Sequence, residues 1–254
     1  VAGGNLGFAL APIILVYFTA HYGLDSLPLL IIPSFILTIA YYHSKLYKQC
    51  SSSEINVLVN RHIPKFHKNT NLIKLNLVMG LRAWTHVAVT TFLPVLLASQ
   101  GYSNTFSGVV LTIFLVGAAL GGLIGGYASD KFGIKKVIVT SLALGILPTY
   151  IFLSSSEITM LTWIAIVLCG AGLQCSAPSS LVWAQKLLPN NAGMASGMML
   201  GLSFGLGGIG TAITATLADY IGLPTSLLLT VLPLVVAVPL AMTIPAPTLD
   251  NKQL

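Results

Sequence analysis

The segment LIKLNLVMGLRAWTHVAVTTFLPVLLA, residues 72–98, is an apolar run long enough to cross a membrane as one helix. The hydrocarbon core of a bilayer takes about 20 consecutive apolar residues in an α-helix. About a third of the way along this run lies Arg82. A guanidinium at that depth costs roughly 2.5 to 3.5 kcal/mol on insertion scales, so an intramembrane arginine marks a candidate functional site.

The composition of the whole chain predicts a polytopic membrane protein. Hydrophobic residues make up 55% of the 254 residues and charged residues 7%, with a mean hydropathy of +0.88. A soluble domain carries about 25% charged residues. The net charge of +6 comes from bases that cluster between apolar runs. The positive-inside rule predicts that clustering without a nucleic-acid partner, so the expected surroundings are a lipid bilayer.

Apolar runs of membrane-spanning length recur along the chain and predict an all-α membrane protein, a polytopic helical bundle of about eight transmembrane helices. The predicted spans are residues 1–21, 26–44, 72–98, 104–128, 135–154, 158–184, 193–217 and 224–245.

The distribution of basic residues predicts the orientation of these spans. The segments around Gly23, Tyr102, Ser155 and Tyr220 contain no Lys or Arg. The other segments between spans, and the tail, contain Lys45, Lys48, Arg61, Lys65, Lys68, Lys131, Lys135, Lys136, Lys186 and Lys252. Loops rich in Lys and Arg stay in the cytoplasm. The linker at residues 45–71 and the tail at residues 248–254 are therefore expected on the cytoplasmic side of the plasma or inner membrane.

An internal repeat predicts how the spans are grouped. The first two spans contain Gly4-x-x-Gly7 and then Pro33, and the last two contain Gly207-x-x-Gly210 and then Pro233. Transporters are often built from repeats of this kind. We expect residues 1–44 to be the last two helices of an N-terminal half and residues 72–247 to be a complete six-helix C-terminal half. Four further N-terminal helices of the same protein would then be missing from the chain and would pack with these.

The loop after the fourth span resembles the signature loop of the major facilitator superfamily, with Ile134 in place of a usual Arg. Its residues that carry the resemblance are Gly126, Asp130, Lys131, Gly133, Lys135 and Lys136. The resemblance implies a twelve-helix transporter in which the Asp contacts helix N-termini and basic side chains and latches one conformation. The alternative is a tight turn flanked by positive-inside lysines.

Glycines at four-residue spacing form two stripes, on the fourth and the seventh span, and each stripe predicts close contact with another helix. The stripes are Gly117, Gly121 and Gly125, and Gly193, Gly197, Gly201 and Gly205. Such contacts allow helices to slide in a transporter, and static packing explains the spacing equally well. In the first span, Gly3, Gly7 and Pro12 resemble the antiporter motif of the superfamily, which favours export.

Four stretches together resemble the bacterial fosmidomycin-resistance-type exporters of this superfamily. They are AGGNLG at 2–7, the Asp130 loop, VWAQKLLP at 182–189, and GMASG at 193–197 continuing to FGLGGIG at 204–210. The resemblance implies proton-driven efflux of a small drug or metabolite, and hence a role in drug resistance. An uptake carrier for organic anions or sugars is the nearest alternative.

The candidate substrate site consists of Arg82, Trp84, Thr85 and His86 in the third span and Gln174 in the sixth. Residues three and four apart share a helix face, so Arg82, Thr85 and His86 are expected on one side. The rise of the helix brings His86 near the bilayer midplane, where transporters hold their substrates.

Both ionisable members of this set have two interpretations. Arg82 could bind a phosphonate, phosphate or carboxylate. It could equally extend to the headgroups or tie helices together through carbonyls. His86 could carry protons, since its unperturbed pKa lies near 6.5, or hydrogen-bond a neighbouring helix.

Enzyme and metal motifs are absent from the sequence. It contains no H-E-x-x-H, no G-x-S-x-G and no C-x-x-C, and no predicted span contains Asp or Glu. We therefore expect no enzymatic activity, no cofactor and no metal. A membrane-embedded enzyme and a non-transporting receptor stay open as alternatives of a different class. A proton-accepting group must be His86 or lie in other helices.

Overall fold

The computed structural model describes residues 2–43, 70–155 and 157–246, and every regular element in these ranges is helical. Six helices are long and apolar enough to cross a membrane, and they match six of the eight predicted spans. They are α4 (Thr70–Ser99), α5 (Asn104–Phe132), α6 (Ile134–Ser154), α7 (Met160–Leu187), α8 (Ala192–Ile221) and the pair α9 (Leu223–Leu229) and α10 (Val231–Met242). The linker predicted at residues 45–71 lies outside the described residues except for Thr70 and Asn71, which begin α4, and the tail at 248–254 also lies outside them.

The first two predicted spans are also helical, but their apolar helices are shorter. α1 (Ala2–Tyr22) is followed by a 3₁₀ helix, η1 (Leu24–Leu30), and by α2 (Ile31–His43). The single α-helix predicted over 26–44 is therefore an α-helix only from Ile31. Pro28 lies inside η1 and has no N–H to donate, which disfavours an α-helix through that turn.

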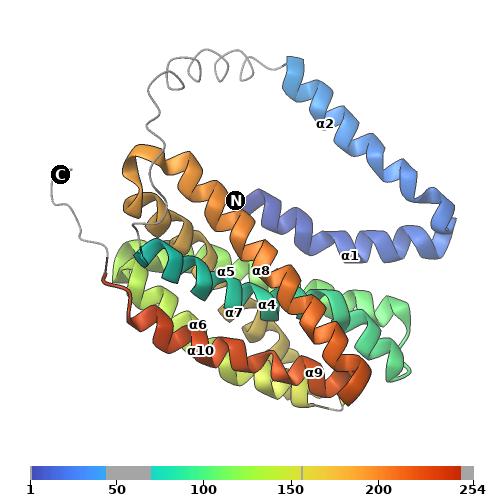
Figure 1. Ribbon diagram of the computed structural model, residues 1–254. Helices are drawn as coiled ribbons and strands as arrows, with labels where there is room; N and C mark the ends of the chain where they lie inside the picture. Colours follow the sequence, from blue (N-terminus) through green and yellow to red (C-terminus); the bar gives the residue numbers. More distant parts are fainter. Residues whose placement is uncertain (1, 44–69, 156, 247–254) are drawn as a thin grey trace. The chain divides into compact units, whose positions relative to one another are not determined.

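The chain divides into two compact units, residues 1–13 with 69–254, and residues 14–68. Within the first unit, α5 packs along α7, α4 along α8, and α6 along α7, while α10 covers α4 and α6 (Figure 1). From α4 onward, short connections make consecutive membrane-spanning helices antiparallel, with α9 and α10 forming one span. Between α5 and α6 the connection is Gly133 alone, with φ 93°. Leu120, Leu123 and Ile124 of α5 are exposed apolar side chains, as a lipid-facing surface requires.

The first glycine stripe lies at the contact between α5 and α7. A Cβ on each of these glycines would overlap the backbone of α7. Gly117 faces Val167, Gly121 faces Ala171 and Gly125 faces Cys175. The two helices therefore approach as closely as their backbones allow, and this approach requires residues without a side chain.

The second stripe was predicted to contact another helix closely, and it makes no such contact with the helices that the structure describes. No described atom lies within 4 Å of a Cβ built at Gly193, Gly197, Gly201 or Gly205. α8 instead turns Gly207 and Gly210 toward α4, where they meet Ala83 and the ring of Trp84. The physical reason is that α8 contains two sets of glycines, the stripe with four-residue spacing and the pair Gly207 and Gly210. Only one of these sets can face α4.

Adjacent glycines on α5 provide a direct test of the close contact with α7. Gly125→Ala places a methyl group against the Cys175 backbone, whereas Gly126 has open space at the same position. We expect Gly125→Ala to lower the free energy of unfolding by about 1 to 3 kcal/mol through overpacking. Gly126→Ala should leave it unchanged or raise it by up to about 1 kcal/mol through helix propensity.

Thermal unfolding of the purified protein in detergent measures the difference between these two variants. Equal melting temperatures for both would show that α5 and α7 do not make this contact.

Candidate functional site

Arg82 lies in the middle of α4 and is only 6% exposed. Its Nη1 donates two hydrogen bonds of 2.8 Å to α7, one to the backbone oxygen of Leu173 and one to Oε1 of Gln174. The buried Nε has no hydrogen-bond partner. Arg82 thus ties α4 to α7 in this structure, which is one of the two roles that its sequence position suggested.

Two features of the α7 sequence lie in the turn that Arg82 contacts. Pro178 lies inside α7 and has no N–H to donate to the backbone oxygen of Gln174, four residues earlier. The hydrogen-bond ladder of the helix is therefore interrupted in the turn that Arg82 contacts. The carboxamide of Gln174 supplies a neutral acceptor in the same turn. A charged donor in a low-dielectric setting requires partners of this kind.

Trp84 and Thr85 have structural partners on other helices. Nε1 of Trp84 donates to Oγ1 of Thr214 in α8 at 2.9 Å, and the ring covers Gly210. Oγ1 of Thr85 donates to the backbone oxygen of Thr230, the residue between α9 and α10, at 2.7 Å. Neither residue lines the cavities formed around Arg82 and His86. The structure therefore separates them from the other three candidates.

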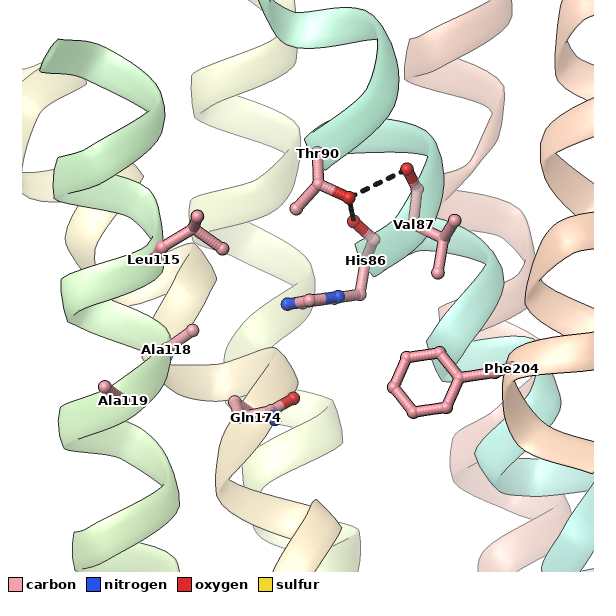
Figure 2. Close-up of a pocket in the computed structure, with 8 residues that line it drawn as sticks. All are labelled: His86, Val87, Thr90, Leu115, Ala118, Ala119, Gln174 and Phe204. Atoms are coloured by element: carbon pink, nitrogen blue, oxygen red, sulfur yellow. Dashed lines mark hydrogen bonds between the residues drawn. The ribbon is translucent and has the colours of Figure 1, made fainter. Parts of the chain in front are cut away.

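His86 lies one turn beyond Arg82, is 7% exposed, and packs against the ring of Phe114 at a centroid distance of 5.6 Å. Its Nε2 is buried without a hydrogen-bond partner. Figure 2 shows the imidazole pointing from α4 toward Leu115 and Ala118 of α5. It borders a cavity of about 290 Å3, the upper cavity, lined by His86, Val87, Thr90, Leu115, Ala118, Ala119, Gln174 and Phe204.

A second cavity of about 150 Å3, the lower cavity, borders Arg82. Its lining consists of Met79, Arg82, Gln174, Ala177, Pro178, Ser180, Leu181, Met199, Leu200, Ser203 and Phe204. Gln174 and Phe204 line both cavities. Sequence reasoning identified Gln174 and missed Phe204. The available signal was that Phe204 is the only aromatic residue between Gly193 and Gly210.

The Asp130 loop lies at the C-terminal end of α5, whereas the α5 residues that line the upper cavity lie in the middle of the helix. Nζ of Lys135 donates to the backbone oxygen of Met242 at 2.8 Å, which joins the start of α6 to the end of α10. Asp130 is exposed, and its carboxylate makes no hydrogen bond or ion pair to any residue in the described ranges. A hollow of about 420 Å3 lies here, lined by Ser129, Asp130, Lys131, Phe132, Gly133, Ile134, Lys135, Lys136, Val182, Lys186 and Ala246.

The chain is similar in sequence to two bacterial proteins. The fosmidomycin resistance protein of Escherichia coli (strain K12) is 28% identical over 225 residues, which are 86% of this chain and 54% of that protein. An uncharacterized transporter of Bacillus subtilis (strain 168), YfnC, is 36% identical over 122 residues, which are 48% of this chain and 29% of that protein. The chain thus spans about half the length of the first relative, 54%, and less of the second, 29%.

Solved structures support the same fold. The crystal structure of FucP, a Major Facilitator Superfamily transporter in the outward conformation, aligns with a TM-score of 0.61. The alignment covers 71% of this chain and 44% of FucP at 18% sequence identity. The likeness therefore concerns the arrangement of the helices.

The family model is the decisive match. The model of the Major Facilitator Superfamily matches residues 75–253, more than half of the chain, and includes α5 to α10 completely. The superfamily consists of multi-pass membrane transporters, so the expectations of a membrane protein and of a chain that is not an enzyme are confirmed. The chain belongs to the Major Facilitator Superfamily.

Proposed function

We propose that the protein is a secondary active transporter that exports a small anionic drug or metabolite by alternating access, coupled to protons. The observation that carries the proposal is a buried guanidinium, that of Arg82, beside a cavity in the membrane-spanning bundle. Support for export comes from the similarity to a fosmidomycin resistance protein at 28% identity. The antiporter-like pattern of Gly3, Gly7 and Pro12 in α1 favours the same direction.

The chemistry of Arg82 suits an anion that arrives and leaves. A guanidinium has five N–H donors, and Nη1 alone makes both of the hydrogen bonds to α7. An incoming phosphonate or carboxylate oxygen can add to the remaining donors or replace Oε1 of Gln174. Charge-assisted hydrogen bonds are about twice as strong as neutral ones, so an anion competes effectively with a carboxamide. When the anion leaves, Oε1 of Gln174 again accepts a hydrogen bond from Nη1.

His86 is the proposed proton carrier of this bundle. The acidic residues that the structure describes, Asp25, Asp130, Glu157 and Asp219, are all exposed, and none lines either cavity. His86 borders the upper cavity with a ring nitrogen that has no partner. Histidine is the side chain that most readily gains and loses a proton near neutral pH.

We further propose that the loop with Gly126, Asp130, Lys131, Gly133, Lys135 and Lys136 gates the cytoplasmic side. The lysine-bearing segments support a cytoplasmic location for this end of the bundle. The Lys135 bond to Met242 supports a role in holding helix ends together, because a cation at a helix C-terminus also interacts favourably with the helix dipole.

Export of fosmidomycin from whole cells tests the role of Arg82. The complete reading frame that contains this chain is expressed in a fosmidomycin-sensitive strain, and drug accumulation is measured. Arg82→Ala removes charge-assisted hydrogen bonds that contribute about 1.5 to 3 kcal/mol, so we expect export to fall about 10- to 100-fold. Arg82→Lys keeps the charge without the planar fork and should be intermediate.

Lys74→Ala serves as the matched control, because it removes a positive charge near the start of the same helix and away from both cavities. Membrane levels of each variant are measured alongside. Unchanged export by a well-expressed Arg82→Ala protein would remove Arg82 from the substrate site.

Proteoliposomes with an imposed pH gradient test the role of His86. His86→Gln keeps hydrogen-bonding groups in the cavity and cannot titrate, so gradient-driven transport should be lost while substrate binding persists. His21→Gln is the control, since His21 is exposed and its Nδ1 contacts the Tyr17 backbone oxygen in its own helix. Full gradient-driven transport by His86→Gln would assign proton coupling to another group.

A further inference from the structure

The two cavities follow one another along the bundle. On α4 the lower cavity contacts Met79 and Arg82, and the upper cavity begins one turn later at His86. On α7, which runs antiparallel to α4, the order is reversed: Gln174 borders both cavities, and the residues after it border only the lower one. The two cavities therefore meet at Gln174 and Phe204, at the level of the turn between Arg82 and His86.

The upper cavity is lined mainly by apolar side chains. These are Val87, Leu115, Ala118, Ala119 and Phe204. Of its polar lining residues, Thr90 donates its hydroxyl to the backbone oxygens of His86 and Val87 in its own helix. Oε1 of Gln174 accepts from Arg82. The imidazole of His86 is thus the polar group that is left with an unpartnered buried nitrogen, Nε2.

The lower cavity has a different chemical character, because it contains the guanidinium. Arg82 lines it, and so do Ser180 and Ser203. Nη1 is occupied by α7, and Nε donates to nothing. An acidic group here would be bound by a cation that is nine-tenths buried and therefore weakly screened.

From this pairing we infer that the transported compound is an amphiphilic anion. Its acidic group binds Arg82 in the lower cavity, and its apolar portion fills the upper cavity past Gln174 and Phe204, where a polar atom can reach Nε2 of His86. The inference rests on the proposed function, which assigns the anion contact to Arg82. It adds the requirement for an apolar group, which a wholly polar anion does not meet.

Helix geometry sets the dimensions of such a ligand. Arg82 and His86 are separated by one helical turn, a rise of roughly 6 Å. An apolar group that a short chain links to the acidic group can therefore reach the upper cavity. Burial of each additional methylene group contributes about a fourfold gain in affinity until the cavity is filled.

Calorimetric titration of the full-length protein in nanodiscs with methyl-, propyl- and hexylphosphonate tests the inference. We expect hexylphosphonate to bind at least tenfold more tightly than methylphosphonate. Ala118→Leu adds a side chain that projects into the upper cavity and should reduce this ratio severalfold. Leu115→Ala enlarges the cavity and should shift the preference toward octylphosphonate.

Leu120→Ala is the matched control for the α5 variants, because Leu120 is 49% exposed and lines neither cavity. It should leave the ratio between hexyl- and methylphosphonate unchanged. Ala118→Leu reduces the volume of the upper cavity and Leu115→Ala increases it. If only one of the two variants folds well, that variant still tests the inference.

Two results would overturn the inference, and they differ in what they say of the proposed function. Equal affinity for methyl- and hexylphosphonate, both weakened by Arg82→Ala, would remove the apolar subsite and leave the anion contact in place. Binding of hexanol as tightly as hexylphosphonate, with no effect of Arg82→Ala, would remove the anion contact and the proposed function with it.

Discussion

The structure depends on the need to satisfy a buried guanidinium in the middle of a membrane-spanning bundle. A charge that is removed from water must keep hydrogen-bond partners, and in this chain Arg82 finds them on α7 at Leu173 and Gln174. Pro178 leaves a further acceptor in the same turn, the backbone oxygen of Gln174, without its usual helical donor. The same contact aligns α4 with α7 and brings Gln174 to the boundary between the two cavities.

Close packing elsewhere determines what the cavities are made of. The contact of Gly117, Gly121 and Gly125 with the α7 backbone brings α5 as near to α7 as two helices can come. One helix face of α5 therefore presents Leu115, Ala118 and Ala119 to the space beside His86. The glycines that contact α7 and the apolar residues that line the upper cavity belong to the same helix, α5. The packing of α5 against α7 therefore also positions the apolar lining of the cavity.

Much of the fold could be predicted from the sequence, because long apolar runs and their flanking lysines specify helix length and order directly. Arg82 was equally visible as a charge inside such a run. The direction of individual side chains was not, because a helical sequence does not state which neighbour each face meets. Trp84 thus donates to Thr214, and Thr85 donates to the backbone oxygen of Thr230. Phe204 of α8 lines both cavities, although the glycine spacing of α8 by itself predicted only helix packing there.

The central claim is that Arg82 serves both as a tie between helices and as the contact for an anion. A double-mutant cycle with Arg82→Ala and Gln174→Leu, read out as methylphosphonate affinity, tests both roles together. If Gln174 competes with the anion, Gln174→Leu changes affinity only while Arg82 is present, and the two effects are non-additive by about 0.5 to 3 kcal/mol. Equal effects of Gln174→Leu in the presence and absence of Arg82 would contradict the account.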